Sequence, residues 1–308
     1  MNHVRASYGV LAVLLPSLAL AQDADSGNRT EQLRAALIKM SKISALAFRS
    51  VEVQDQAILR NAGIGGGQET EVSGTRANGV LTATIDEDRV AFAAGRMVAQ
   101  GDDGDWKLRH DCLADGSPLP FVHDPIRTFA YLAELPDAAL KVTQVEPGRS
   151  KDRDVLVYSV SLSGATAQDV TLAGLLPKAS GGPGRMLVMG GGRRRTPPPE
   201  TTVDFAFYVD PATNEIERLH SKTYSKSSMP GGMVMRVAGP GGIEIQQGGD
   251  EEEAAEDDSG PTPIKKGLPQ RKLGKDISLT EFDVSYSKHG SAETLELTAR
   301  AKTLLGLN

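Results

Sequence analysis

The stretch from Gly74 to Arg109 constrains the fold more than any other part of the chain. It reads GTRANGVLTATIDEDRVAFAAGRMVAQGDDGDWKLR, in which short apolar runs are separated by compact turn signals. Alternating apolar residues, as at 81–85, are typical of a strand with one buried face. The turn at 101–105 combines Gly, which tolerates positive φ, with Asp, which bonds its own backbone, and Trp106 opens the next strand. The stretch predicts an antiparallel meander.

Two helices are expected to pack against this sheet. Asn28 is placed to cap the first helix, whose apolar residues recur at helical spacing at Leu33, Ala36, Leu37 and Met40. Asp124 and Pro125 form a strong helix start in the middle of the chain. An apolar stripe follows this start and ends before Pro136. The sequence therefore predicts an α+β fold that is mainly β.

Further strands are predicted in the second half of the chain. Alternation predicts strands at 154–162 and 203–209, the second joined to a return strand by a turn at 210–214. The chain is expected to close with strands at 277–287 and 293–299.

Residues 1–21 are interpreted as a secretory signal peptide. A mildly basic start precedes an apolar run interrupted by Pro16, and Ala19-Leu20-Ala21 supplies small residues for cleavage between Ala21 and Gln22. The apolar run is shorter than the roughly 20 residues that span a bilayer, which disfavours a membrane anchor. A lipid anchor is disfavoured because Gln22 is not a cysteine. The mature protein is expected to be exported to the periplasm or outside the cell, and not to be an integral membrane protein.

Residues 22–308 are expected to form a single domain with two low-complexity insertions. The chain has 33 Gly and 17 Pro among its 308 residues, which implies much loop. The insertion at about 178–200 carries consecutive arginines and prolines, and the insertion at about 229–275 contains an acidic run at 250–258. Both are interpreted as loops without regular structure.

Charge and cysteine content exclude some classes of function. The formal net charge of −6 argues against nucleic acid or an anionic membrane as the main partner. The single Cys112 cannot form an internal disulfide and is interpreted as a small buried apolar residue.

The search for catalytic or metal chemistry finds no persuasive pattern. His110, Cys112, His123 and Asp124 are the only local group of metal-ligand types, and their spacing matches no familiar zinc site. The chain contains no G-x-S-x-G nucleophile elbow. We therefore expect neither an enzyme nor a cofactor, and no metal.

Three phrases of the sequence resemble the LolA-like superfamily of exported bacterial carriers of lipoproteins and lipids. They are GVLTATIDEDRVAFAAGRMVAQGDDGDWKLR, FAFYVDPATNEIERLHSKTYS and FDVSYSKHGSAETLEL. The resemblance covers roughly residues 22–307 and implies a strongly curved antiparallel sheet, an unclosed half-barrel with the N-terminal and mid-chain helices packed on its concave face. It also implies an apolar cavity that takes acyl chains. The long insertions are departures from the family, in which the lipoprotein carriers depend on an arginine in an early strand; Arg49 lies in a comparable early strand here.

The leading hypothesis is a non-catalytic extracytoplasmic protein that binds a lipid or other apolar molecule between sheet and helices. The aromatic residues proposed to line the ligand site are Trp106, Phe121, Phe129, Phe205 and Phe207. Each of them has ordinary core packing as its alternative role. The alternative for the whole protein is a structural or protein-interaction component of the cell envelope without a ligand.

Overall fold

The fold is taken from a computed structural model of the chain. It describes residues 14–56, 68–110, 112–113, 115–117, 119–177, 200–226, 233–238, 242–247, 268, 271, 273–274, 276–292 and 295–307, with side chains left out for 14–26, 233–238 and 242–247.

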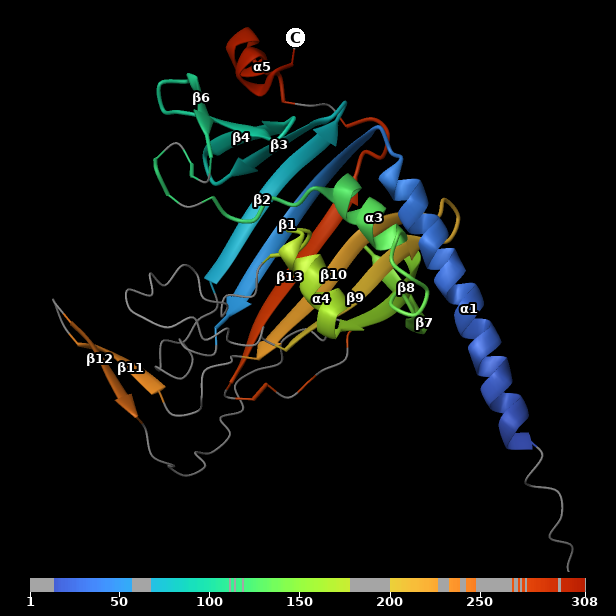
Figure 1. Cartoon of the computed structure of the whole chain (residues 1–308). Coiled ribbons are helices and arrows are strands. Elements are labelled where there is room, and N and C mark those ends of the chain that lie inside the picture. Colours follow the sequence, from blue (N-terminus) through green and yellow to red (C-terminus); the bar gives the residue numbers. More distant parts are fainter. Residues whose placement is uncertain are drawn as a thin grey trace, which may run out of the picture.

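The fold is built on an 11-stranded sheet in which every neighbouring pair of strands is antiparallel (Figure 1). The strand order is β6-β5-β4-β3-β2-β1-β13-β10-β9-β8-β7. The strands are β1 (Ala45–Asp55), β2 (Gln68–Ala77), β3 (Val80–Ile85), β4 (Asp88–Ala93), β5 (Arg96–Gln100), β6 (Trp106–Arg109), β7 (Val142–Ser150), β8 (Arg153–Ser163), β9 (Thr201–Asp210), β10 (Glu215–Lys226) and β13 (Ile277–Ser287).

The predicted meander is confirmed as β2 to β6, and the predicted hairpin is confirmed as β9 and β10. The last strand, β13, lies between β1 and β10, so it joins a sheet half from the start of the chain to a half from its middle. Apolar alternation along each strand supplies the buried face that holds these pairs together.

Three helices cover one face of the sheet, which we call the helix-covered face. They are α1 (Leu14–Ser41), α3 (Pro125–Ala133) and α4 (Gly164–Leu172), and Figure 1 shows α3 and α4 lying across the sheet. Their buried apolar side chains form one core with the sheet, including Leu37 of α1, Phe129 of α3 and Val170 of α4. The mid-chain helix begins as predicted, because Asp124 accepts a hydrogen bond from Arg127 N and Pro125 occupies the first turn.

Two expectations about helices are wrong. The first helix begins at Leu14 rather than after an Asn28 cap, because the residues before Asn28 continue the helical backbone. The strand expected at 293–299 is replaced at its end by α5 (Ala299–Leu305). Thr298 caps α5 through Ala301 N, and Gly306 ends it in the left-handed conformation; these end signals decide the local structure.

The opposite face carries a smaller core under α5. Trp106 packs there with Ala91, Val98, Ala301 and Leu305. Successive residues of a strand point to opposite faces, so Val90 and Ala99, next to Ala91 and Val98, belong to the main core instead.

The sheet is open and is not the strongly curled half-barrel that the resemblance implied. Its edge strands β6 and β7 are not paired with each other in the described part of the chain. The helices α1, α3 and α4 pack apolar side chains onto the helix-covered face.

The first insertion, apart from Glu200, and most of the second lie outside the described residues. In the second, β11 (Met233–Ala238) and β12 (Gly242–Gln247) pair as a separate two-stranded sheet. The expectation of no regular structure at 229–275 is therefore wrong for these strands, which flank a Gly-Pro-Gly sequence; β11 is apolar except at Arg236, and β12 contains an alternating Ile-Glu-Ile-Gln run.

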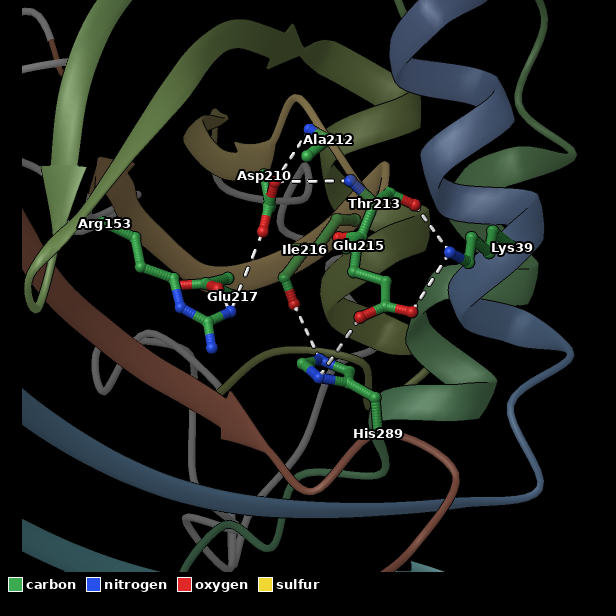
Figure 2. A network of polar contacts seen from close by, with 9 residues as sticks. All are labelled: Lys39, Arg153, Asp210, Ala212, Thr213, Glu215, Ile216, Glu217 and His289. Carbon is green, nitrogen blue, oxygen red and sulfur yellow. Dashed lines mark hydrogen bonds and ion pairs between the residues drawn. The ribbon is translucent and has the colours of Figure 1, made fainter.

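Polar contacts hold the end of α1 to the sheet (Figure 2). Lys39 Nζ donates to Thr213 O at 2.5 Å and lies 3.0 Å from Glu215 Oε1. His289 Nδ1 lies 3.6 Å from Glu215 Oε2, which connects the chain after β13 to the same point. The turn that presents these groups is stabilised by Asp210, whose carboxylate accepts from Ala212 N and Thr213 N.

Gly74→Ala is expected to destabilise the protein. A Cβ at Gly74 would lie 2.5 Å from Phe48 Cζ and 2.5 Å from Thr82 O, and the second of these is backbone that cannot move freely. Overpacking of this kind costs about 1–3 kcal/mol, to be measured by urea denaturation. Gly27→Ala is the control, because nothing lies within 4 Å of its added Cβ. Equal stability of Gly74→Ala and wild type would contradict this account of the sheet.

Candidate functional site

A cross-strand row on the helix-covered face places apolar side chains between two arginines. The register pairs Arg76 with Leu81, Leu81 with Phe92, Phe92 with Met97, and Met97 with Arg109. Directly opposed residues share a face, and neighbouring strands lie about 4.8 Å apart. We call Leu81, Phe92 and Met97 the apolar row; an arginine stands at each of its ends.

This row is the floor of a cleft of about 500 Å³, which we call the arginine cleft. Its other wall comes from the start of α3, with Val122, Asp124 and Arg127, and from Gly174 beyond α4. Ligand sites for small molecules typically have volumes of roughly 300–1,000 Å³ and combine an apolar lining with a few polar groups. The arginine cleft has the size and the lining of such a site.

The cleft is positively charged although the whole chain carries a net charge of −6. The described residues that line it include four arginines, Arg76, Arg96, Arg109 and Arg127, but a single carboxylate, Asp124. Asp124 Oδ2 lies 3.5 Å from Arg76 Nε. The other oxygen, Oδ1, accepts from Arg127 N at 3.3 Å. One carboxylate cannot balance this number of guanidinium groups.

Two of the arginines are held by backbone carbonyls. Arg127 Nη2 donates to Ala173 O at 3.0 Å, and Arg96 Nη1 donates to Leu304 O at 3.3 Å. These bonds leave other guanidinium N–H groups of both side chains available, since arginine has five donors.

A buried aromatic cluster positions the chain before α3. His123 is fully buried, and its Nε2 lies 2.9 Å from Tyr286 Oη of β13. Its ring lies 5.3 Å from that of Phe282 and 6.0 Å from that of Phe48. Burial lowers the pKa of His123 to about 3 and raises the pKa of Tyr286 well above its ordinary value. His123 is therefore a neutral packing residue that anchors this wall of the cleft.

The aromatic residues proposed to line a ligand site do not form one lining. Phe129, Phe205 and Phe207 are almost completely buried in the main core, and Phe121 packs at its margin. Trp106 lies on the other face of the sheet, under α5. None of the five lines the arginine cleft.

The arginines of the cleft were not among the residues that we proposed from the sequence. A usable signal was present: the two-residue turns at 78–79, 86–87 and 94–95 set the register of three successive hairpins. Counting outward from those turns aligns Arg76 with the apolar row.

The cluster of metal-ligand residue types is only partly brought together, because His110 and Asp124 line the arginine cleft while the other two lie elsewhere. His123 is buried against Tyr286, whereas His110 is exposed and Cys112 is partly exposed, so the expectation that this cysteine is buried is wrong. Within the described ranges, no three His, Cys, Asp or Glu side chains come together as metal ligands would. No helix in the described part of the chain combines the length and the apolar character needed to cross a membrane.

No protein-family model matches the chain, and no curated protein matches it in sequence. Solved structures match it at low identity. LprF from Mycobacterium bovis is 10% identical, with 88% of this chain and 96% of that chain covered and a TM-score of 0.39. Mycobacterium tuberculosis lipoprotein LppX is 7% identical, with 87% and 97% covered and a TM-score of 0.38.

The LolA superfamily protein NE2245 from Nitrosomonas europaea also matches. It is 8% identical, with 86% of this chain and 94% of that chain covered and a TM-score of 0.24. A member of the LolA superfamily, to which the sequence resemblance pointed, is thus among the structural matches.

His123 is expected to make stability depend on pH between pH 6.5 and 5. The folded pKa of about 3 lies below the ordinary value of 6.5, so only the unfolded chain takes up a proton in this range. The free energy of unfolding should therefore fall as the pH is lowered, by up to about 1.4 kcal/mol per pH unit. Urea denaturation at several pH values measures this slope.

His123→Phe should remove the corresponding part of the slope, because Phe fits an aromatic cluster and does not titrate. His110→Ala, at an exposed position, should keep the wild-type slope. If His123→Phe keeps the wild-type slope, His123 is not the group that makes the free energy of unfolding depend on pH.

Proposed function

We propose that this protein is a non-catalytic extracytoplasmic protein that binds a lipid or other apolar molecule between its sheet and its helices, starting at the arginine cleft. The observation that carries the proposal is the apolar row, which borders the cleft and continues into the main core. Leu81 belongs to that core and Phe92 packs against it. An apolar chain lying on this row would extend a surface that is already apolar.

Many side chains of the described core have almost no exposed surface, so in this proposal a long ligand enters between sheet and helices as the helices move outward. Phe129 of α3 packs against the ring of Tyr286 with 5.2 Å between ring centroids. Phe121 is next to Val122, which lines the cleft. In this proposal, displacement of α3 brings Phe121 and Phe129 into contact with the ligand. Phe205 and Phe207 lie deeper in the same core.

The export of the protein is also part of the proposal. Cleavage between Ala21 and Gln22 would shorten α1 at its start. Among the α1 side chains that the structure describes, those from 27 to 41, the ones in the main core are Leu33, Ala36, Leu37 and Met40. Cleavage after Ala21 would retain these core contacts.

A binding role is favoured over an enzymatic one. Asp124 is the only acid among the described residues of the cleft, and it is already engaged with Arg76 and with the start of α3. An acid–base or nucleophilic reaction needs such groups to converge on a substrate atom. The alternative is an envelope protein that interacts with other proteins without a ligand, and the nearly complete burial of Phe129, Phe205 and Phe207 in the main core is what favours it.

Binding of an uncharged long-chain alcohol such as dodecanol tests the proposal. The exported protein, stripped of bound lipid, should bind dodecanol in a dye-displacement assay. Phe92→Gln should weaken that binding by about tenfold or more, because an apolar contact of a Phe side chain is lost. Leu172→Gln is the control, since Leu172 lies on α4 and is 76% exposed.

Native mass spectrometry of the protein purified from the envelope provides a second measurement. Co-purified lipid in wild type, reduced in Phe92→Gln, is the expected result. Absence of lipid together with absence of dodecanol binding would favour the ligand-free alternative.

A further inference from the structure

We propose that the arginine cleft selects amphiphiles with an anionic head group, a carboxylate or a phosphate, which Arg76 and Arg127 bind while the tail lies on the apolar row. This inference rests on the proposed function, because it assigns the other end of the same ligand. It specifies the chemical class of the ligand's head group, which an apolar pocket alone would not do.

Arg76 carries the argument because its guanidinium is mostly buried and incompletely bonded. Its side chain is 19% exposed, and its Nε is buried with no hydrogen-bond partner among the described residues. The Asp124 carboxylate lies at 3.5 Å from that nitrogen without the geometry of a hydrogen bond. A buried donor without an acceptor is costly, so an oxygen atom of a ligand would gain a bond that the protein lacks.

Asp124 indicates which group the site accommodates. Its carboxylate already lies between Arg76 and the first N–H groups of α3, so a carboxylate is compatible with the charge at this position. The helix start and the neighbouring arginines both favour negative charge. With Arg76 and Arg127 beside a single acid, the cleft keeps an excess of positive charge for a second anion.

The geometry of the apolar row gives the head group and the tail of the ligand different places in the cleft. Arg76 and Leu81 are directly paired across β2 and β3, so a head group on Arg76 places the first carbons of its tail over Leu81. Phe92 and Met97 continue the row away from Arg76. Arg127, on α3, faces the same cleft from the opposite wall. The site therefore presents Arg76 at the near end of an apolar surface, and Arg109, paired with Met97, stands at the far end of the row.

The experiment compares ligands that share a tail or share a head group. Dodecanoate, dodecyl phosphate and dodecanol have the same tail, whereas acetate and inorganic phosphate have only the anion. Wild type should bind dodecanoate or dodecyl phosphate about tenfold or more tightly than dodecanol, because a charge-assisted hydrogen bond is added. Acetate and inorganic phosphate should not displace dodecanoate at comparable concentrations.

Two substitutions should act in opposite directions. Arg76→Gln should remove most of the preference for the anionic ligand and leave dodecanol affinity within about twofold of wild type. Asp124→Asn should tighten dodecanoate binding, because it removes the competing carboxylate while Asn still caps the helix. A purely structural role of these residues predicts no gain of affinity in Asp124→Asn.

Controls for charge and folding accompany these variants. Arg49→Gln changes the charge of the whole protein equally, but Arg49 pairs with exposed Glu71 away from the cleft. The Arg49→Gln variant should prefer dodecanoate over dodecanol to the same extent as wild type. Arg127→Gln is the second cleft variant, to be used if Arg76→Gln fails to fold, and it should lower the preference for dodecanoate as well.

The outcomes distinguish the two proposals. Equal affinity for dodecanoate and dodecanol, with dodecanol binding still sensitive to Phe92→Gln, would overturn the head-group inference and leave the proposed function intact. If acetate or inorganic phosphate displaces the bound ligand as effectively as dodecanoate does, the proposal of an amphiphilic ligand is overturned. The cleft would then be a site for free anions. Failure to bind any of the ligands would overturn both.

Discussion

The pairing of β13 with β1 and β10 is the interaction on which the rest of the structure depends. This strand comes from the end of the chain and joins the meander half of the sheet to the β7–β10 half. It also contributes Phe282 and Tyr286 to the cluster around His123. Because His123 immediately precedes the Asp124 cap, β13 positions the start of α3 and with it one wall of the arginine cleft.

On the helix-covered face, the apolar main core and the charged arginine cleft lie in different places. The main core is closed and apolar beneath α1, α3 and α4. Towards β6, the same face changes to a row of apolar residues between arginines. The cost of burying Arg76 is only partly offset by Asp124, whose carboxylate also caps α3. A cleft with uncompensated donors beside an apolar floor is a feature of binding sites rather than of solid cores.

Much of the fold was predictable from local patterns. Alternation and turn residues correctly indicated β2–β6 and the β9–β10 hairpin, and Asp124-Pro125 indicated α3. The helix at the end of the chain was not predictable in this way. Its bounds depend on a cap at Thr298 and on Gly306, and not on a long repeat of apolar residues. The aromatic site prediction grouped Trp106 with Phe129, which pack on opposite faces of the sheet. Sequence spacing shows which residues of one strand share a face, but not which face another strand presents.

The sequence by itself determined the strands, their alternation and the short turns that align Arg76 with Leu81, Phe92 and Met97. These features depend on neighbouring residues, and a two-residue turn sets the register of its hairpin locally. Only the tertiary structure decided what lies opposite that row. Arg127 and Asp124 reach it because His123 is bonded to Tyr286, a contact between residues 163 positions apart in the chain. Such a pairing depends on β13 taking its place between β1 and β10 in the assembled sheet, so no local pattern encodes it.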